Sequence, residues 1–287
     1  MAEKKEVELL KPKIDLVFQS LFSQKNEEIT KNFIEALLNE KVNKLSINGG
    51  KELFREYPED KLGILDLELD VNEKEKVDVE VQLLKKDNFV PRLIYYFSKM
   101  YEQQIHKGED YGTIKRVVLI AIVDFEFDLA KELKEAETQW LLRCTKHPEI
   151  VLTKLMEFNI IEIGKAKNNY KVNKEDEKNQ WMLFLDNPNS REVQEIMEKN
   201  EKIKEAVIEV KKMSEDEKMR RLADLREKAI LDEKEIYKTG LHEGENIGLR
   251  NGKDEAKRED AIAMIKEKMS NEVIARVTGL TVTEIEE

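Results

Sequence analysis

The stretch LGILDLELDVNEKEKVDVEVQLL, residues 62–84, decides the fold, because apolar and polar residues alternate along both of its halves. Alternation with a period of two is typical of a half-buried β-strand, and the polar link NEKEK between the runs predicts a β-hairpin. The apolar face holds Leu65, Leu67, Leu69, Val71, Val77, Val79 and Val81. The opposite face holds Asp66, Glu68, Asp70, Asp78, Glu80 and Gln82.

The flanking segments predict a mixed central sheet with helices on its faces. A short helix is expected from Asp15, and a longer one after Asn26, where apolar residues recur at helical spacing. Pro91 suits the first turn of a helix that runs to about His106. The run VVLIAIVDF, residues 117–125, is almost entirely apolar, which predicts a strand buried on both faces. This order of elements indicates an α/β fold.

A further helix is expected at about 128–144, followed by a strand at about 157–163. Cys144 lies in that helical stretch, where a buried thiol is the plainer interpretation. It is the only cysteine, so an internal disulfide and a cysteine-built zinc site are excluded.

The composition changes after about residue 186, where highly charged amphipathic helices begin. We expect three parts: a domain over 1–186, a charged helical segment over 187–239, and a small helical tail over 240–287. Two capping boxes are predicted, Ser214 with Glu217 and Thr281 with Glu284. Glycines recur every fourth residue from 240 to 252, which favours a flexible hinge or a close helix contact.

The formal net charge of −11 speaks against a polyanionic partner, because phosphate binding depends on Lys and Arg. Residues 92–116 nevertheless carry a local group of basic side chains, so a basic face can exist on an acidic protein. The N-terminus lacks the apolar core of a signal peptide, and no window approaches the length of a membrane span. A soluble, cytoplasmic protein with no membrane partner is therefore expected.

The acidic face of the hairpin is the best candidate for chemistry. Glu80 and Gln82 are two residues apart on one strand, so they leave the same face, and Asp66 can lie opposite them. Two converging carboxylates suit Mg²⁺, for which Mn²⁺ can substitute. Such an ion lowers the pKa of a bound water and stabilises the charge on a phosphate under attack. Acidic side chains on a hairpin usually only face solvent, so the spacing alone leaves both interpretations open.

In the order of several segments, the chain resembles the Rpn family of recombination-promoting nucleases and putative transposases. The segments are KPKIDLVFQSLF (11–22), GILDLELDV (63–71), VDVEVQ (77–82), RLIYYFSKMYEQQIHKGEDY (92–111) and VVLIAIVDF (117–125). The glycine ladder at 240–252 and the ending IARVTGLTVTEIEE are also similar to that family's C-terminal part.

The resemblance implies a restriction-endonuclease-like PD-(D/E)XK core in residues 1–186, with a helical C-terminal extension. It implies Mg²⁺-dependent cleavage of double-stranded DNA, linked to recombination or mobile elements. The acidic motif then maps onto Asp66 and Glu80 as catalytic metal ligands. Gln82 takes the usual lysine position, where a neutral amide can orient water but cannot supply lysine's positive charge.

Further positions match the family and are expected to support the site: Lys13, Asp15, Tyr96 and Gln104. The basic residues Arg92 and Lys99 are candidates for DNA contact, although basic side chains on a helix usually only face solvent. Cutting two strands with one site per chain favours a homodimer. Two alternatives stay open. The chain can be a non-catalytic DNA-binding or accessory protein that retains the nuclease fold, or an interaction protein built on the charged helices. The tail has the apolar pattern of a helix-turn-helix, but its last helix is acidic where base recognition wants basic or amide side chains.

Overall fold

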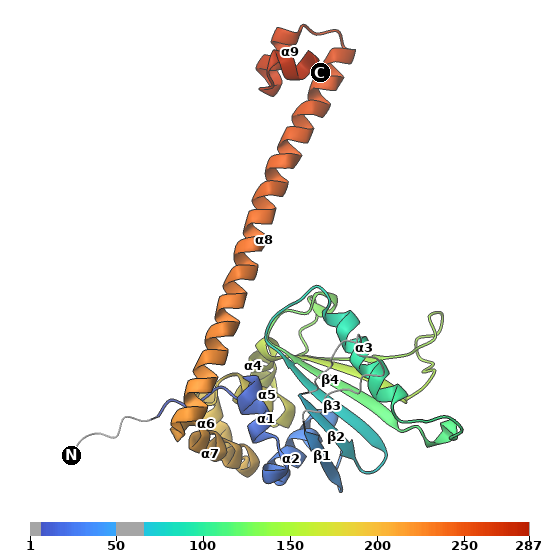
Figure 1. Ribbon diagram of the computed structural model, residues 1–287, viewed down its shortest axis with the longest axis vertical. Helices are drawn as coiled ribbons and strands as arrows, with labels where there is room; N and C mark the ends of the chain where they lie inside the picture. The colour runs from blue at the N-terminus through green and yellow to red at the C-terminus, as the bar shows by residue number, and fades with distance from the viewer. Residues whose placement is uncertain (1–6, 50–65, 287) are drawn as a thin grey trace, which may run out of the picture. The chain divides into compact units, whose positions relative to one another are not determined.

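A six-stranded mixed sheet organises the N-terminal part of the chain, as Figure 1 shows. The computed structural model describes residues 7–49 and 66–286. The strand order is β1-β2-β3-β4-β6-β5, with β3, β4 and β6 parallel and the other pairings antiparallel. The strands are β1 (Leu45–Gly49), β2 (Leu67–Val71), β3 (Glu75–Gln82), β4 (Arg116–Val123), β5 (Glu137–Leu141) and β6 (Met156–Glu162).

The predicted hairpin is confirmed as β2 and β3, whose register places Leu67 opposite Val79. Asn72 and Glu73 turn the chain between them with φ angles of 51° and 59°. The apolar face is buried as its alternation predicts, with Leu67, Leu69, Val71, Val77 and Val79 in the core and Val81 packed against it. Leu65 lies outside the described residues.

Helices cover both faces of the sheet, which confirms the expected fold class (Figure 1). One face carries α3 (Phe89–Glu102), whose Leu93, Phe97 and Met100 pack on the odd-numbered residues of β4. The main core, with Trp181 fully buried at its centre, lies on the other face. Its helices are α1 (Asp15–Leu21), α2 (Glu27–Leu38), α4 (Ile163–Val172), α5 (Glu177–Asp186), α6 (Arg191–Met197) and α7 (Glu201–Glu215). Short 3-10 turns are η1 (Gln24–Asn26), η2 (Tyr111–Thr113) and η3 (Asp128–Ala130).

The strands expected at 117–125 and 157–163 are confirmed as β4 and β6, whereas the helix expected at 128–144 is wrong. That segment forms η3 and then β5, which pairs with β6 from Glu137↔Ile161 to Leu141↔Glu157. Pairing with β6, the next strand along the chain, has overridden the local helical pattern. Cys144 follows β5 and is exposed, so the buried thiol is wrong as well.

The two predicted capping boxes have opposite outcomes. Thr281 and Glu284 form theirs before α10 (Val282–Glu286), with Thr281 N to Glu284 Oε2 at 2.8 Å and Glu284 N to Thr281 Oγ1 at 3.3 Å. Ser214 instead lies inside α7, where its hydroxyl donates to the Val210 carbonyl and accepts the Leu10 amide. Asp216 accepts the Met219 amide at the start of the next helix.

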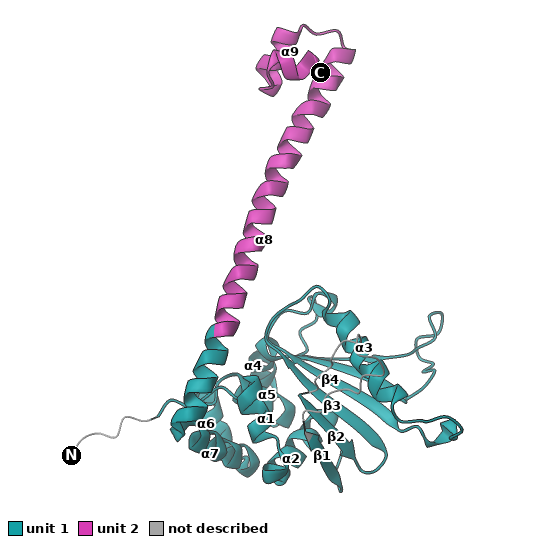
Figure 2. Ribbon diagram, in the orientation of Figure 1, with its two compact units in different colours: residues 1–228 teal, residues 229–287 magenta. Residues whose placement is uncertain are grey.

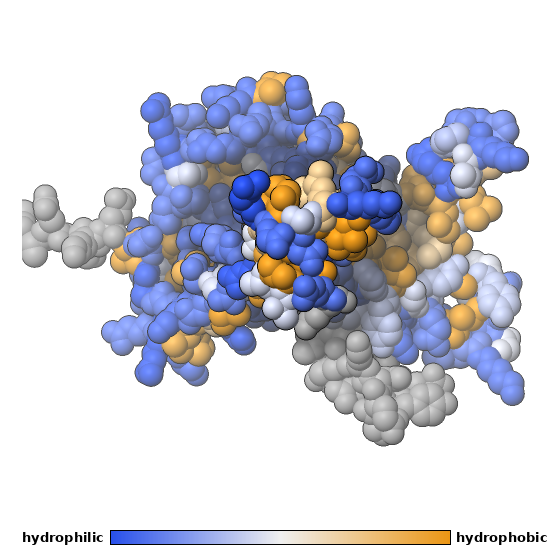
Figure 3. Space-filling model, turned by 90° about the horizontal axis from the view of Figure 1, so that it is seen from above, coloured by the Kyte–Doolittle hydropathy of each residue, from blue (hydrophilic) through white to orange (hydrophobic). Residues whose placement is uncertain are grey.

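The chain divides into two compact units, residues 1–228 and 229–287 (Figure 2). Helix α8 (Glu217–Lys266) begins in the first unit and contains all four glycines of the ladder. Apart from the helix's own nearby backbone, no described atom lies close enough to contact a Cβ atom added at any of these glycines. In the second unit, α9 (Asn271–Thr278) and α10 enclose a small cluster with Ala261 of α8. Figure 3 shows hydrophilic residues over most of the face it draws, with hydrophobic ones in small groups. Among the described residues, no helix combines the length and apolar character that crossing a membrane requires.

The domain boundaries at residues 186 and 239 stay a prediction, and α6 and α7 provide the test of the first. Their Val193, Ile196, Ile203 and Val210 are buried in the main core. Each buried aliphatic side chain contributes about 1.5–3 kcal/mol, so together they rival the ~5–15 kcal/mol that keeps a domain folded. A chain that ends at residue 186 is therefore expected to lose cooperative thermal unfolding, whereas one that ends at 228 keeps it. Circular dichroism checks this, and equal melting curves for both truncations would contradict it.

Candidate metal centre

Asp66 and Glu80 face each other across the open end of the hairpin. Asp66 directly precedes β2, and continuing the register from Leu67↔Val79 places it opposite Glu80. Its Oδ2 accepts the backbone amide of Val81 at 2.9 Å, and its carboxylate also accepts a hydrogen bond from Gln19 of α1. The acidic face of the hairpin therefore brings the two predicted carboxylates together.

Burial and mutual repulsion disfavour the charged forms of this pair. Burial, followed by the charge of Asp66, raises the pKa of Glu80 to about 8, although Arg92 and Gln82 act in the opposite direction. Burial also raises the pKa of Asp66, against the hydrogen bond from Val81. Two carboxyl groups that resist ionisation side by side have strong electrostatic reason to accept a divalent cation.

Gln82 joins Glu80 to helix α3. Its Nε2 donates to Glu80 Oε2 at 3.0 Å, and its Oε1 accepts a hydrogen bond from Arg92 Nη2. The guanidinium carbon of Arg92 lies 5.9 Å from the centre of the Tyr96 ring. Arg92 and Tyr96 are four residues apart, so one face of α3 presents both toward the hairpin.

Asp78 is a third carboxyl group on this face, and the sequence pattern did not single it out. It is 0% exposed, and neither of its carboxyl oxygens has a hydrogen-bond partner within the described part of the chain. Burial, then the charges of Glu80, Asp66 and Glu68, raises its pKa well above the usual value. Burial and the neighbouring acids therefore both favour the protonated form of Asp78.

Lys13 lies just before α1, and Asp15 is the first residue of that helix. Lys13 Nζ lies 2.7 Å from Asp186 Oδ1 and 3.2 Å from Asp124 Oδ2. Burial lowers the pKa of Lys13, but its bonds to these two carboxylates outweigh burial, and the net pKa is raised. Asp124 N donates to the carbonyl of Gln82 at 3.0 Å, which couples Lys13 to the end of β3. The charge of Asp15 acts on Asp66 and contributes to its raised pKa.

Gln104 is not brought to this centre. It exchanges two hydrogen bonds with the backbone of Lys115, at 3.3 and 3.0 Å, and thereby ties the end of α3 to the start of β4. Arg92 lies twelve residues earlier, which is roughly 18 Å along a helix. Lys99 lies on α3 between them, seven residues after Arg92 and on the same side of the helix.

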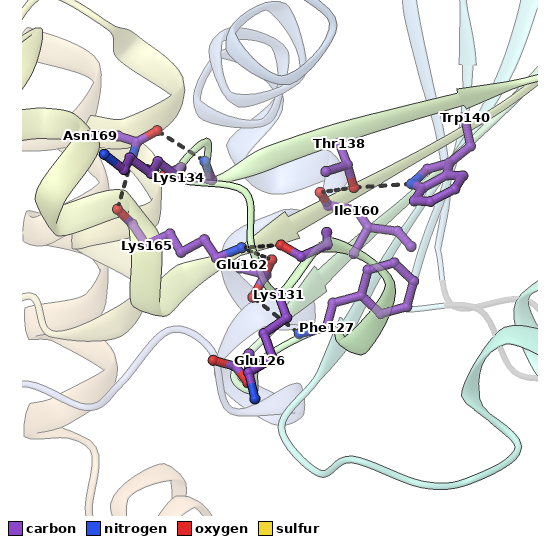
Figure 4. A network of polar contacts seen from close by, with 12 residues as sticks. Glu126, Phe127, Lys131, Lys134, Thr138, Trp140, Ile160, Glu162, Lys165 and Asn169 are labelled. Atoms are coloured by element: carbon purple, nitrogen blue, oxygen red, sulfur yellow. Dashed lines mark hydrogen bonds and ion pairs between the residues drawn. The ribbon is translucent and has the colours of Figure 1, made fainter.

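A polar network fixes the segment that follows Asp124 (Figure 4). Glu162, at the end of β6, accepts the Phe127 amide at 3.1 Å and pairs with Lys165 at 2.6 Å. Lys165 also donates to the carbonyl of Ala130 at 2.8 Å, and Asn169 accepts the Ala136 amide. These bonds hold residues 127–136 against α4, and with them the chain directly after Asp124.

The donor set fits a hard divalent cation. Glu80 is 2% exposed, and its Oε1 has no hydrogen-bond partner among the described residues, so one carboxylate oxygen is available as a ligand. Mg²⁺ commonly takes only one or two carboxylates and keeps several waters. No group of three or more His, Cys, Asp or Glu residues in the described ranges is arranged to hold a metal. Because Asp66 lies opposite Glu80 and one oxygen of Glu80 is unpaired among the described residues, these two carboxylates are the ones that would hold a cation.

Sequence reasoning missed Gln19, Asp78 and Asp124. Gln19 and Asp124 come from elements distant in sequence, and no local pattern shows that they meet the hairpin. Asp78 had a signal, because it shares a face with Glu80 and neighbours a strand that the sequence already predicted to be buried.

Comparison with protein families gives a match over most of the chain. A family model described as PD-(D/E)XK nuclease family transposase matches residues 12–240, a range that includes the hairpin, α3 and Lys13. Comparison with curated proteins and with solved structures gives no match.

Proposed function

Because the chain belongs to the PD-(D/E)XK nuclease family transposases, we propose that it is a metal-dependent endonuclease that cleaves double-stranded DNA. Recombination or the movement of mobile elements is the proposed setting. The observation that carries this proposal is the meeting of Asp66 and Glu80, with one carboxylate oxygen of Glu80 left unpaired among the described residues.

The residues of the centre have two proposed roles, which are to bind the metal ion and to orient a water molecule. Asp66 and Glu80 would hold Mg²⁺, with Mn²⁺ as a substitute, through two carboxylates that otherwise repel each other. When bound, the ion lowers the pKa of a coordinated water and stabilises negative charge on the phosphate. Gln82 is already oriented by Glu80 and Arg92, so its remaining N–H can direct a water at a fixed angle. Lys13, Asp15 and Tyr96 support these positions, and Lys99 is proposed to contact the DNA backbone.

We also propose that two chains act together, because each has one such site and duplex DNA has two strands. Helix α8 supports this, since apolar side chains along it are exposed, among them Leu225, Leu231, Ile236 and Ile247. Leu225, Ile236 and Ile247 recur every eleven residues, close to three helical turns, so they lie along one side of the helix. A continuous exposed apolar surface is typical of a surface that meets another chain.

Cleavage of supercoiled plasmid tests the function. With Mg²⁺ or Mn²⁺ the full-length protein is expected to produce nicked and then linear DNA, and with EDTA neither product. Paired cutting yields the linear form early, whereas independent cutting yields nicked circles first. Absence of cleavage with metal, combined with a gel shift in its absence, would contradict the enzyme and favour the alternative of a DNA-binding protein that retains the fold.

A further inference from the structure

The position two residues after Glu80 holds a neutral amide, and the cation that contacts this amide comes from α3. Arg92 Nη2 donates to Gln82 Oε1, while Gln82 Nε2 donates to Glu80 Oε2 at 3.0 Å. These two bonds orient the amide with its acceptor toward the cation and its donor toward the anion. Arg92, Gln82 and Glu80 therefore form one continuous polar chain that ends at the carboxylate pair.

The charge of Arg92 reaches both carboxyl groups. Through Gln82, the guanidinium of Arg92 is one hydrogen-bonded side chain away from Glu80, and the strand register places Asp66 opposite Glu80. The guanidinium carbon also lies 5.9 Å from the centre of the Tyr96 ring. A cation in this position lies within the local field of the centre, in partly buried surroundings where charges interact more strongly than in water.

The guanidinium also has an unused donor. Its Nε is buried and has no hydrogen-bond partner among the described residues. A buried donor without an acceptor carries a desolvation cost of about 1–3 kcal/mol, which an anionic oxygen would remove. The planar guanidinium also binds phosphate oxygens better than most side chains do.

We propose that Arg92 supplies, from helix α3, the positive charge that lysine at the position of Gln82 would otherwise bring to the phosphate being cleaved. This inference rests on the proposed nuclease function. In this inference Gln82 orients the attacking water and Arg92 supplies the positive charge near the phosphate. Two side chains from different elements thus perform the two roles that a single lysine would have.

Removal of Arg92 tests this inference, because it is expected to slow DNA cleavage but to strengthen metal binding. Arg92→Ala is expected to slow single-turnover DNA cleavage about 100-fold, the usual effect of deleting one group that stabilises transition-state charge. The same substitution should tighten Mn²⁺ binding roughly twofold to tenfold, because a repelling cation has left the carboxylate pair. Calorimetric titration measures the second effect without DNA. A merely structural role would weaken metal binding and cleavage together.

Chemical rescue separates charge from hydrogen bonding. Guanidinium ion at low millimolar concentration is expected to restore cleavage by Arg92→Ala at least about tenfold, whereas urea, its neutral analogue of the same shape, is not. Lys41→Ala is the matched control, because Lys41 is 89% exposed and its removal deletes one positive charge from an exposed turn that the site does not use. If Arg92→Ala fails to fold, Arg92→Lys replaces it and should keep cleavage within about tenfold of the native rate.

Three results would overturn the inference while the native protein still cleaves DNA. They are unchanged cleavage by Arg92→Ala, equal rescue by urea and guanidinium, or weaker Mn²⁺ binding in the variant. Failure of the native protein itself to cleave with metal would instead contradict the proposed function, and the Mn²⁺ titration would still test the electrostatic role of Arg92.

Discussion

Asp66→Asn and Glu80→Gln are each expected to lower the rate of metal-dependent DNA cleavage by two to three orders of magnitude (about 100- to 1000-fold) while the chain stays folded. Each substitution removes one ligand charge and keeps the size of the side chain. The carboxamide oxygen introduced by Asp66→Asn can still accept the Val81 amide, which Asp66 accepts at 2.9 Å, so the end of the hairpin keeps its hydrogen bond. Alanine at this position would lose that hydrogen bond. A slower rate could then come either from the missing metal ligand or from local disorder at the end of the hairpin.

Asp70→Asn provides the matched control for this loss. Asp70 lies on the same acidic face of β2 but pairs with Asn48 and with two lysines rather than with Glu80. It should keep nearly native cleavage. Plasmid cleavage at equal metal concentration, with circular dichroism of each variant, makes the comparison. If all three variants cleave at the native rate, Asp66 and Glu80 are not the catalytic ligands.

The metal-free protein is expected to lose stability as the pH rises, and Glu80 contributes to that loss. Its pKa is about 8 in the folded chain against 4.5 ordinarily. A carboxyl with a raised folded-state pKa contributes its full stabilisation below the ordinary value, and this is lost as the pH rises toward about 8. The loss should amount to about a few kcal/mol at most, because a tenfold change in the affinity of a carboxyl group for its proton corresponds to about 1.4 kcal/mol.

Thermal unfolding in EDTA at about pH 5.5 and pH 8.5 measures this effect. Glu80→Gln should melt at a higher temperature than the native chain at the upper pH, and its melting temperature should depend less on pH. Some dependence should persist because Asp78, whose pKa is also raised, remains. Adding Mg²⁺ at the upper pH should raise the melting temperature of the native chain but not that of Glu80→Gln. Identical pH profiles for the two chains would show that burial does not raise the pKa of Glu80.

The parts of the fold that were predictable are those where local pattern and tertiary structure agree. The alternation of residues 65–82 predicts the two strands, the face that each side chain occupies and the pairing of the strands, because a hairpin needs no distant partner. Residues 117–123 are apolar enough to require burial on both faces. The helix expected at 128–144 failed because Glu137–Leu141 becomes a strand only by pairing with β6. Ser214 was misplaced because its hydroxyl serves a tertiary contact with Leu10 rather than a helix end.

The site shows the same division. Asp66, Glu80 and Gln82 lie on one hairpin, so residue spacing was enough to predict that they meet. The contact of Arg92 with Gln82 depends on how α3 packs over the sheet, which no spacing reveals. Gln19 and Asp124 come from α1 and from the end of β4, so the sequence contains no local sign of their part. Asp78 shows that a carboxyl group on a polar strand face can still be completely buried when a helix covers that face.

Titration of the full-length protein with Mn²⁺ tests the central claim most directly, since it asks whether Asp66 and Glu80 together hold one cation. Calorimetry near pH 8 should show about one ion per native chain, with protons released as Glu80 ionises on binding. In both Asp66→Asn and Glu80→Gln this binding should be lost or weakened by at least about tenfold, and in Asp70→Asn it should persist. Equal affinity and stoichiometry in all four proteins would mean that the metal, if it binds, binds elsewhere, and the centre described here would be contradicted.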